Sequence, residues 1–363
     1  MGANDVARAA AAFDRGRLRT ARELRGRSQS EVAQAVGVTP TAISQFENGH
    51  SRPAGATLTR LADHLDVPVR FFESRGPAVE EEPAAFFRSL RRTTVGQRRK
   101  NVAAISLLHD LVEAIEERVT LPDVRVPRLD HLTDGDDIEK AASEARESMG
   151  LSPDGPVANV VLAMERHGVV VARYQVMADT VDAFSVRYRR PVVVLGTDKR
   201  LRDRSRFDAA HELGHLVLGH GVDHVGTKEA EAQAHRFAAA FLMPANSIRV
   251  ALPARADWSA LVSLKAHWQV SIAALLKRAH TLEVISTTTY TQAMKTMSIR
   301  GWRRDEPGNL GAPERPVLLG EAVRVAQENG TTLSDLADEA GLPLSDLERL
   351  LVDSAAGAPR VSI

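Results

Sequence analysis

The residues best suited to chemistry lie in one short run, His211-Glu212-Leu213-Gly214-His215. In a helix, residues four apart lie on one face, so His211 and His215 can direct two imidazoles at a single ion. Zinc binds neutral imidazole and, in catalytic sites, keeps a position open for water. Glu212 can take a proton from the metal-bound water, whose pKa zinc lowers to about 7. The run therefore predicts a Zn²⁺ site with Glu212 as catalytic base. Two surface histidines on a helix are the alternative interpretation.

The residues around this run predict a buried helix. Apolar side chains recur through it at Phe207, Ala210, Leu213, Leu216 and Val217. Gly214 stands mid-helix, where glycine costs about 1 kcal/mol relative to alanine, which indicates that another element packs closely against it. Three strand-like segments precede the helix, at 168–172, 183–188 and 192–195.

A third metal ligand must be a carboxylate or another imidazole, because the chain contains no cysteine. The next predicted helix, 228–243, follows Thr227, which is a suitable N-cap. This helix carries Glu229, Glu231 and His235, and periodicity alone does not choose among them. For the two glutamates, a solvated first turn that complements the helix dipole is the alternative.

A second pattern, near the N-terminus, has the spacing of a helix-turn-helix. Ser28 can cap a helix, Gly37 supplies a turn, and Thr39 caps a second helix that has Pro40 at its favoured first position. Short polar side chains at the start of that second helix can reach base edges in the major groove. Arginines just upstream can bind phosphates, at Arg15, Arg17, Arg19, Arg22, Arg25 and Arg27. The pattern predicts binding to double-stranded DNA, and a helical domain that makes only protein contacts is the alternative.

Residues 14–72 resemble the Xre/Cro-repressor class of helix-turn-helix domain, in the run Ile43-Ser44-Gln45-Phe46-Glu47-Asn48-Gly49 and in 58–72 after it. The resemblance and the basic patch together predict these DNA contacts: Gln29, Asn48, Arg17 and Arg25 at phosphates, and Thr39, Thr41, Ser44 and Gln45 at bases or nearby phosphates. Dimerisation is expected for repressors of this class, so the resemblance implies a homodimer on a double-stranded operator.

The metal motif resembles the ImmA/IrrE family of metallopeptidase-like proteins. The likeness covers Arg206-Phe207-Asp208-Ala209-Ala210-His211-Glu212-Leu213-Gly214-His215 and the following segment Glu231–Pro244. In that family two histidines and a glutamate of the second helix bind zinc. The family's glutamate, six residues before the Phe of its Phe-Ala-Ala segment, falls on Glu231, so the resemblance implies Zn²⁺ held by His211, His215 and Glu231. Family members often carry Asn where this chain has His235, which leaves the role of that imidazole open.

The same resemblance suggests how a substrate would lie. Residues 182–185 and 191–194 look like the family's strands before the zinc helix, and in zincin-like folds a substrate peptide adds to an edge strand. The transition-state oxyanion needs a hydrogen-bond donor besides zinc. The candidates, which the sequence does not rank, are Tyr174, Tyr188, His224 and His235.

The whole pattern predicts an α+β chain. We expect an all-α helix-turn-helix domain at 1–75, a linker and helical connector at 76–150, a mostly helical, zincin-like metallopeptidase core with a small β-sheet at 151–250, and a C-terminal helical region at 251–363. The net charge is zero, with 47 basic and 47 acidic residues, so DNA binding must come from local patches. The N-terminus has no signal-peptide core and the apolar runs are shorter than a membrane span, so we expect a cytoplasmic protein without membrane contact.

Two weaker charge patterns remain. The basic run at 88–100 can extend a DNA contact, although a solvated helix face is the preferred interpretation. Residues 332–350 again have helix-turn-helix spacing, but their many acids indicate a helical packing or interaction unit.

Three functions fit these patterns. The first is a transcription regulator whose metallopeptidase-like domain senses or processes a signal, since the family is linked to stress response, mobile-element control and toxin–antitoxin systems, several members acting by cleaving a helix-turn-helix repressor. The second is an active endopeptidase that its DNA-binding part brings to a repressor-bound operator. The third is a non-catalytic sensor of a small molecule or protein. A purely structural site needs no base, so Glu212 favours catalytic competence.

Overall fold

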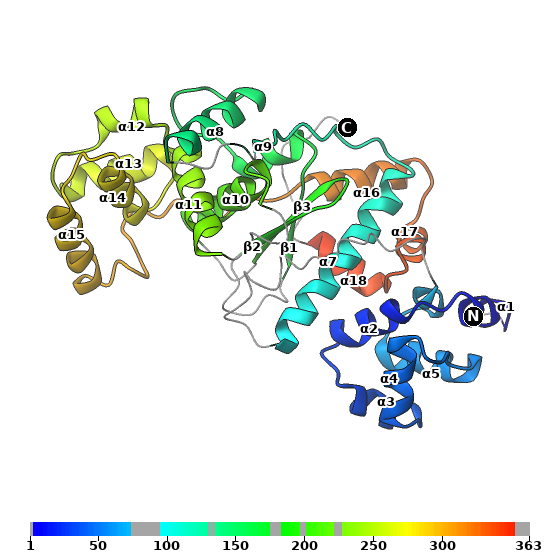
Figure 1. Ribbon diagram of the computed structural model, residues 1–363. Coiled ribbons are helices and arrows are strands. Elements are labelled where there is room, and N and C mark those ends of the chain that lie inside the picture. Colours follow the sequence, from blue (N-terminus) through cyan, green and yellow to red (C-terminus); the bar gives the residue numbers. More distant parts are fainter. Residues whose placement is uncertain are drawn as a thin grey trace. The chain divides into compact units, whose positions relative to one another are not determined.

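In the computed structural model, the described residues are 3–73, 95–129, 131, 135–174, 183–196, 201–220 and 227–352. They form two compact units, one from the residues up to Leu121 together with those from Leu318 onward, the other from Pro122 to Val317 (Figure 1). The fold is α+β and mostly helical, as predicted. No helix in the described ranges is long and apolar enough to span a bilayer.

The first unit is helical throughout its described part. Its elements are α1 (Ala3–Ala11), α2 (Arg15–Leu24), α3 (Gln29–Val36), α4 (Pro40–Asn48), α5 (Gly55–Leu65), the 3₁₀ helix η1 (Val69–Phe72), α7 (Val95–Glu116), α16 (Leu318–Glu328), α17 (Leu333–Ala340) and α18 (Leu344–Val352).

The connection between α3 and α4 uses the caps that the sequence predicts. The Ser28 hydroxyl accepts a hydrogen bond from the Glu31 backbone N–H at 3.2 Å, and the Glu31 carboxylate accepts one from the Ser28 N–H at 2.7 Å, which together form a capping box. Gly37 ends α3 in the left-handed region at φ 70°, where glycine carries no steric penalty. Thr39 caps α4, and Pro40 occupies its first turn. The predicted helix-turn-helix geometry is confirmed.

The long helix α7 organises the rest of this unit by packing against both α2 and α17. Its apolar face is buried at Ile105, Leu108, Leu111, Val112 and Ile115. Arg118, just after α7, pairs with Glu339 of α17. The acidic segment 332–350 is therefore a packing unit within the described structure. Most of the basic run at 88–100 lies outside the described residues.

The second unit contains a three-stranded sheet in the order β1-β3-β2, with β1 at Val170–Tyr174, β2 at Ala183–Arg187 and β3 at Pro191–Gly196. Its helices are α8 (Gly135–Ser148), α9 (Val160–Arg166), α10 (Arg202–Val217), α11 (Lys228–Leu242), α12 (Ala245–Ala251), α13 (Trp258–Trp268), α14 (Ile272–Thr281) and α15 (Thr287–Ile299). The central strand β3 runs parallel to β1 and antiparallel to β2, and every one of its residues is buried. That burial explains its continuous apolar sequence.

Helix α10, which carries the metal motif, lies beside the sheet and against α11 (Figure 1). Its residues from Ala209 to Val217 are all buried. A Cβ atom built on Gly214 would stand 3.0–3.2 Å from side-chain atoms of Phe237 on α11. The close packing that the sequence predicts for Gly214 is confirmed.

A buried carboxylate fixes the N-terminal half of α10. Glu314, in the segment after α15, accepts hydrogen bonds from the backbone N–H groups of Val160 at 2.8 Å and Val161 at 3.1 Å, and it pairs with Arg206 of α10. Both side chains are almost fully buried, at 0% and 2% exposure. Because each buried charge has a partner, this contact ties α9, α10 and a distant loop together.

Enlarging residue 214 tests the contact between α10 and α11. Gly214→Val is expected to lower the free energy of unfolding by about 1–3 kcal/mol, because extra atoms in a packed core force side chains or backbone to shift. Chemical denaturation followed by circular dichroism and tryptophan fluorescence measures this loss. Ala232→Val is the matched control, since Ala232 is exposed on α11. A Gly214→Val protein as stable as the control would show that the helices are not in tight contact.

Candidate metal centre and nucleic-acid interface

The three predicted zinc ligands converge on one point between α10 and α11. The Nε2 atoms of His211 and His215 are 3.1 Å apart. The carboxylate of Glu231 places one oxygen 3.3 Å from Nε2 of His211 and the other 3.7 Å from Nε2 of His215. Ligands in a tetrahedral zinc site, each about 2.0–2.1 Å from the ion, are separated by roughly 3.3 Å. The separations and the chemistry of these donors fit a zinc ion.

The two reserve ligands lie in different surroundings. Glu229 is exposed in the first turn of α11, which fits the interpretation of a solvated residue near the helix N-terminus. His235 lies beside the cluster instead. One potential ligand atom from each of His211, Glu231 and His235 falls within 4.8 Å of the other two.

The carboxylate of Glu212 is buried next to this cluster and is held from the sheet. Its Oε2 accepts a hydrogen bond of 2.7 Å from the hydroxyl of Ser185, which is on β2. Burial raises the pKa of Glu212 to about 7, although the charge of His211 and the hydrogen bond from Ser185 both act to lower it. A carboxylate with a proton affinity near neutrality suits general acid–base catalysis.

His215 is held in place through a chain of two further side chains. Nδ1 of His215 lies 2.9 Å from Nδ1 of His220, and Nε2 of His220 lies 2.9 Å from the amide oxygen of Gln233. Because that oxygen only accepts, His220 donates from Nε2, and in a neutral ring its Nδ1 then accepts from His215. The proton of His215 is thereby kept on Nδ1, and the lone pair of Nε2 faces the cluster, as a metal ligand requires.

The surroundings of His215 and Glu231 favour the protonation states in which each side chain can bind a metal ion. Burial lowers the pKa of His215 well below its usual value, and the charges of His211 and His220 add to the effect. Burial acts to raise the pKa of Glu231, but its hydrogen bond to His211 and the histidine charges bring it below the usual value. The pKa of His211 is raised: burial opposes the change, and the hydrogen bond with Glu231 and the nearby carboxylates outweigh burial. His215 is thus neutral and Glu231 ionised near pH 7.

Two of the four oxyanion-donor candidates can be placed. Tyr188 is half-buried just after β2, and His235 is exposed at the edge of the ligand cluster. The side chain of Tyr174 and the whole of His224 lie outside the described residues.

In the first unit, α4 presents most of the predicted DNA contacts at the surface. Thr39, Thr41, Gln45 and Asn48 are exposed, and Ser44 is half-buried. The opposite side of α4 is buried at Ile43, Phe46 and Glu47, which fixes the direction of the polar side. The Asn48 amide donates to the Ser44 hydroxyl at 3.3 Å, so these two predicted contacts lie side by side.

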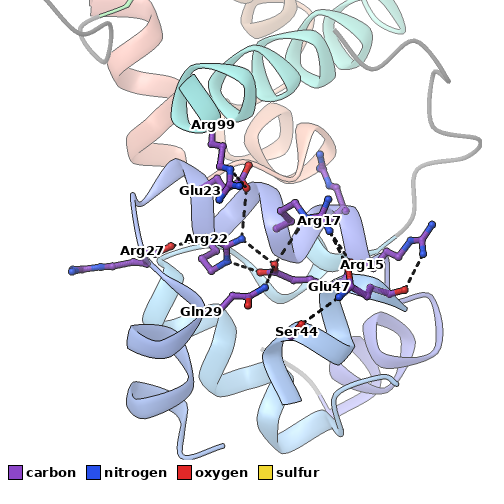
Figure 2. A network of polar contacts seen from close by, with 12 residues as sticks. Arg15, Arg17, Arg22, Glu23, Arg27, Gln29, Ser44, Glu47 and Arg99 are labelled. Carbon is purple, nitrogen blue, oxygen red and sulfur yellow. Dashed lines mark hydrogen bonds and ion pairs between the residues drawn. The ribbon is translucent and has the colours of Figure 1, made fainter. Parts of the chain in front are cut away.

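A buried carboxylate connects α2, α3 and α4 (Figure 2). Glu47 accepts hydrogen bonds from Nε of Arg22 at 2.5 Å and from Nη2 at 2.9 Å, and its Oε2 also accepts from Nε2 of Gln29 at 2.8 Å. The bidentate pair fixes the angle between the helices. It also makes Arg22 a structural residue and orients Gln29 at the first turn of α3.

The arginines of the predicted basic patch divide into two groups. Arg17 is buried over the Phe71 ring, donates to the Phe71 carbonyl at 3.0 Å and pairs with Asp110 of α7. Arg25 donates to the Leu65 carbonyl at 2.8 Å and pairs with Asp346 at 2.9 Å. These guanidinium groups bind other parts of their own unit. The exposed arginines of the patch are Arg15, Arg19 and Arg27.

Comparisons with known families agree with both halves of this description. Residues 164–280 match the model of a peptidase family described as the IrrE N-terminal-like domain, and residues 18–72 match a helix-turn-helix model. The chain combines a helix-turn-helix domain with an IrrE-like domain. The cluster of His211, His215 and Glu231 lies within the IrrE-like domain, and α3 and α4 lie within the helix-turn-helix domain. Both predicted family resemblances are confirmed.

Curated relatives match the helix-turn-helix domain. An uncharacterized HTH-type transcriptional regulator of Sinorhizobium medicae is 33% identical over 61 residues, which are 17% of this chain and 44% of the relative. The HTH-type transcriptional regulator SutR of Escherichia coli is 40% identical over 57 residues, which are 16% of this chain and 32% of the relative. The chain thus covers less than half the length of these relatives. They support a DNA-binding regulator of the helix-turn-helix type.

Removing the acceptor at Gln233 tests the hydrogen-bond chain in the IrrE-like domain. Gln233→Ala is expected to weaken Zn²⁺ binding about 10–100-fold, the usual effect of losing a group that orients a ligand. Competition with a chromophoric chelator measures the affinity. Gln233→Glu keeps an acceptor at the same place and should bind zinc at least as tightly as the native chain. Equal affinity in the alanine and glutamate variants would rule out a role for the chain His215-His220-Gln233.

Proposed function

We propose that the chain is a transcriptional regulator whose IrrE-like domain is a zinc-dependent endopeptidase. The observation that carries the proposal is the convergence of His211, His215 and Glu231 beside the buried carboxylate of Glu212. When bound there, zinc supplies a Lewis acid and lowers the pKa of water toward neutrality. A structural site would need only the ligands, so the base next to them supports hydrolysis.

In the proposed reaction, Glu212 accepts the proton of the attacking water and delivers it to the leaving amine. Ser185 keeps one oxygen of Glu212 in place through its 2.7 Å hydrogen bond. The chain His215-His220-Gln233 maintains the His215 tautomer. Among the described strands, β2 is at an edge of the sheet and carries Ser185, so a peptide that adds to this edge would pass close to Glu212.

The helix-turn-helix domain would deliver this activity to an operator. Exposed Thr41 and Gln45 can reach base edges, while Asn48 and the exposed arginines can bind phosphates. We propose a homodimer on double-stranded DNA in the cytoplasm, as in repressors that read two half-sites. The substrate class that fits the family resemblance is a helix-turn-helix repressor, with a role in stress response, mobile-element control or a toxin–antitoxin system.

A second candidate function is a non-catalytic sensor that uses the same metal centre. One observation favours it: His235 offers a fourth donor group beside His211 and Glu231. Structural zinc sites bind four protein ligands and no water. A sensor of this kind would bind zinc and DNA without cleaving any protein.

Replacing the proposed base separates these two functions. Glu212→Gln is expected to retain zinc but to lower the rate of proteolysis by about 10²–10⁴-fold, the usual contribution of general acid–base catalysis. Zinc content is measured by elemental analysis, and cleavage is followed by mass spectrometry on repressors encoded beside the gene. Glu229→Gln is the matched control, because Glu229 is exposed on α11. Equal cleavage by the two variants would refute the proposed role of Glu212.

The DNA-binding half has its own test on α4. Ser44→Ala and Gln45→Ala are each expected to weaken binding to the preferred operator by about 1–3 kcal/mol if they remove a base contact. Fluorescence anisotropy measures the affinity for an operator selected from random duplexes and for an unrelated duplex. Gln34→Ala, on the exposed side of α3, is the control. If operator affinity does not fall, or falls equally for both duplexes, α4 does not read sequence.

A further inference from the structure

We propose that His235 is a fourth protein ligand that closes the metal centre in the resting protein, and that a substrate peptide must displace it. The inference rests on the proposed metal centre and adds a form of regulation to it. His235 follows Glu231 by one helical turn on α11, so both side chains lie on the same face of that helix.

The His235 ring lies as close to His211 as the ring of the predicted ligand His215 does. The ring centroids of His211 and His235 are 4.4 Å apart with planes at 90°, while those of His211 and His215 are 4.7 Å apart at 81°. One donor atom from each of His211, Glu231 and His235 falls within 4.8 Å of the other two. His235 is therefore near enough to share an ion with His211 and Glu231.

The surroundings of His235 also leave it one nitrogen suited to a metal. Its ring forms a hydrogen bond with the backbone of Glu231, one turn back along α11. Since that backbone partner accepts through its carbonyl, one ring nitrogen donates and, in the neutral ring, the other keeps its lone pair.

A fourth protein donor would change the chemistry of the site. Catalytic zinc sites have three protein ligands and a water, whereas four protein ligands make a closed site. With His235 bound, Glu212 would have no activated water to deprotonate. His211 and His215 are buried, but His235 is exposed, so its side chain can turn outward without disturbing the core. The resting protein would then be a latent peptidase that opens when His235 leaves.

Cobalt substitution tests this arrangement without relying on activity. The full-length protein is loaded with Co²⁺, whose visible absorption reports the ligands and their number, and is titrated with azide, a small anion that binds an exchangeable coordination position. The native spectrum should not respond to azide, because protein groups fill every position. His235→Ala should respond to azide. Its Co²⁺ affinity should also fall, by at least the roughly 10–100-fold that is usually lost when a residue that orients a metal ligand is removed. His267→Ala, which removes an exposed histidine from α13, should behave like the native chain.

The outcomes separate this inference from the proposed function. If the native protein responds to azide as His235→Ala does, its metal centre already has an open coordination position and His235 is not a ligand. His235 could then only form hydrogen bonds with a substrate. Unchanged Co²⁺ affinity in His235→Ala would also overturn the inference while leaving a three-ligand centre intact. If neither protein takes up Co²⁺ or Zn²⁺, the proposed metal centre itself fails.

Discussion

The close approach of α10 and α11 is the constraint on which the rest of the IrrE-like domain depends. The two histidines of the metal motif are on α10, the glutamate is on α11, and separations of 3.3–3.7 Å between them require the helix backbones to be near each other. Gly214 permits this approach, because any side chain there would meet Phe237. Glycine at this position lowers the stability of the helix. Alanine there would hold α10 and α11, and with them the histidines and the glutamate, farther apart.

Buried charged groups then fix α10 in the unit. Glu314 pairs with Arg206 at one end of α10, and Lys265 of α13 pairs with Asp203 at 2.8 Å near the same end. Removing one partner from such a pair leaves an uncompensated buried charge, which typically costs about 3–5 kcal/mol. These contacts come from segments 60 or more residues away in sequence, so the orientation of the metal motif is set by the whole unit.

Local physical rules made much of this structure predictable. The caps at Ser28 and Thr39, the left-handed Gly37 and the N-cap at Thr227 each depend on residues within one helical turn, and each is found as expected. The strand-like segments at 168–172, 183–188 and 192–195 also predicted the three strands. The short helices α9 and α12 were not predicted, since seven residues give too little periodicity to distinguish a helix from a loop.

The groups around the cluster were harder to predict for a different reason. Ser185 contacts the proposed base Glu212, and His220 and Gln233 form a hydrogen-bond chain to the predicted ligand His215, only because a strand, a helix end and a second helix meet. A serine in a half-buried strand or a histidine after a helix has no sequence pattern that indicates its partner. The spacing of His211 and His215 is informative because one helix carries both residues. Contacts that join different elements have no such periodicity.

The difference between contacts within one helix and contacts between distant elements also explains why the sequence overestimates the basic patch of the helix-turn-helix domain. Six arginines close in sequence look equivalent, yet Arg17, Arg22 and Arg25 each find an acidic partner, and Asp110 and Asp346 lie far away in the chain. Counting arginines therefore overestimates the charge available to phosphates, because each internal pair removes one cation from the surface. In the proposed complex with DNA, fewer phosphate contacts would supply non-specific affinity, so a larger share of binding would come from the polar side of α4, where Thr41 and Gln45 are exposed. Discrimination between operators and other DNA would then depend on α4 more than the number of arginines in the sequence suggests.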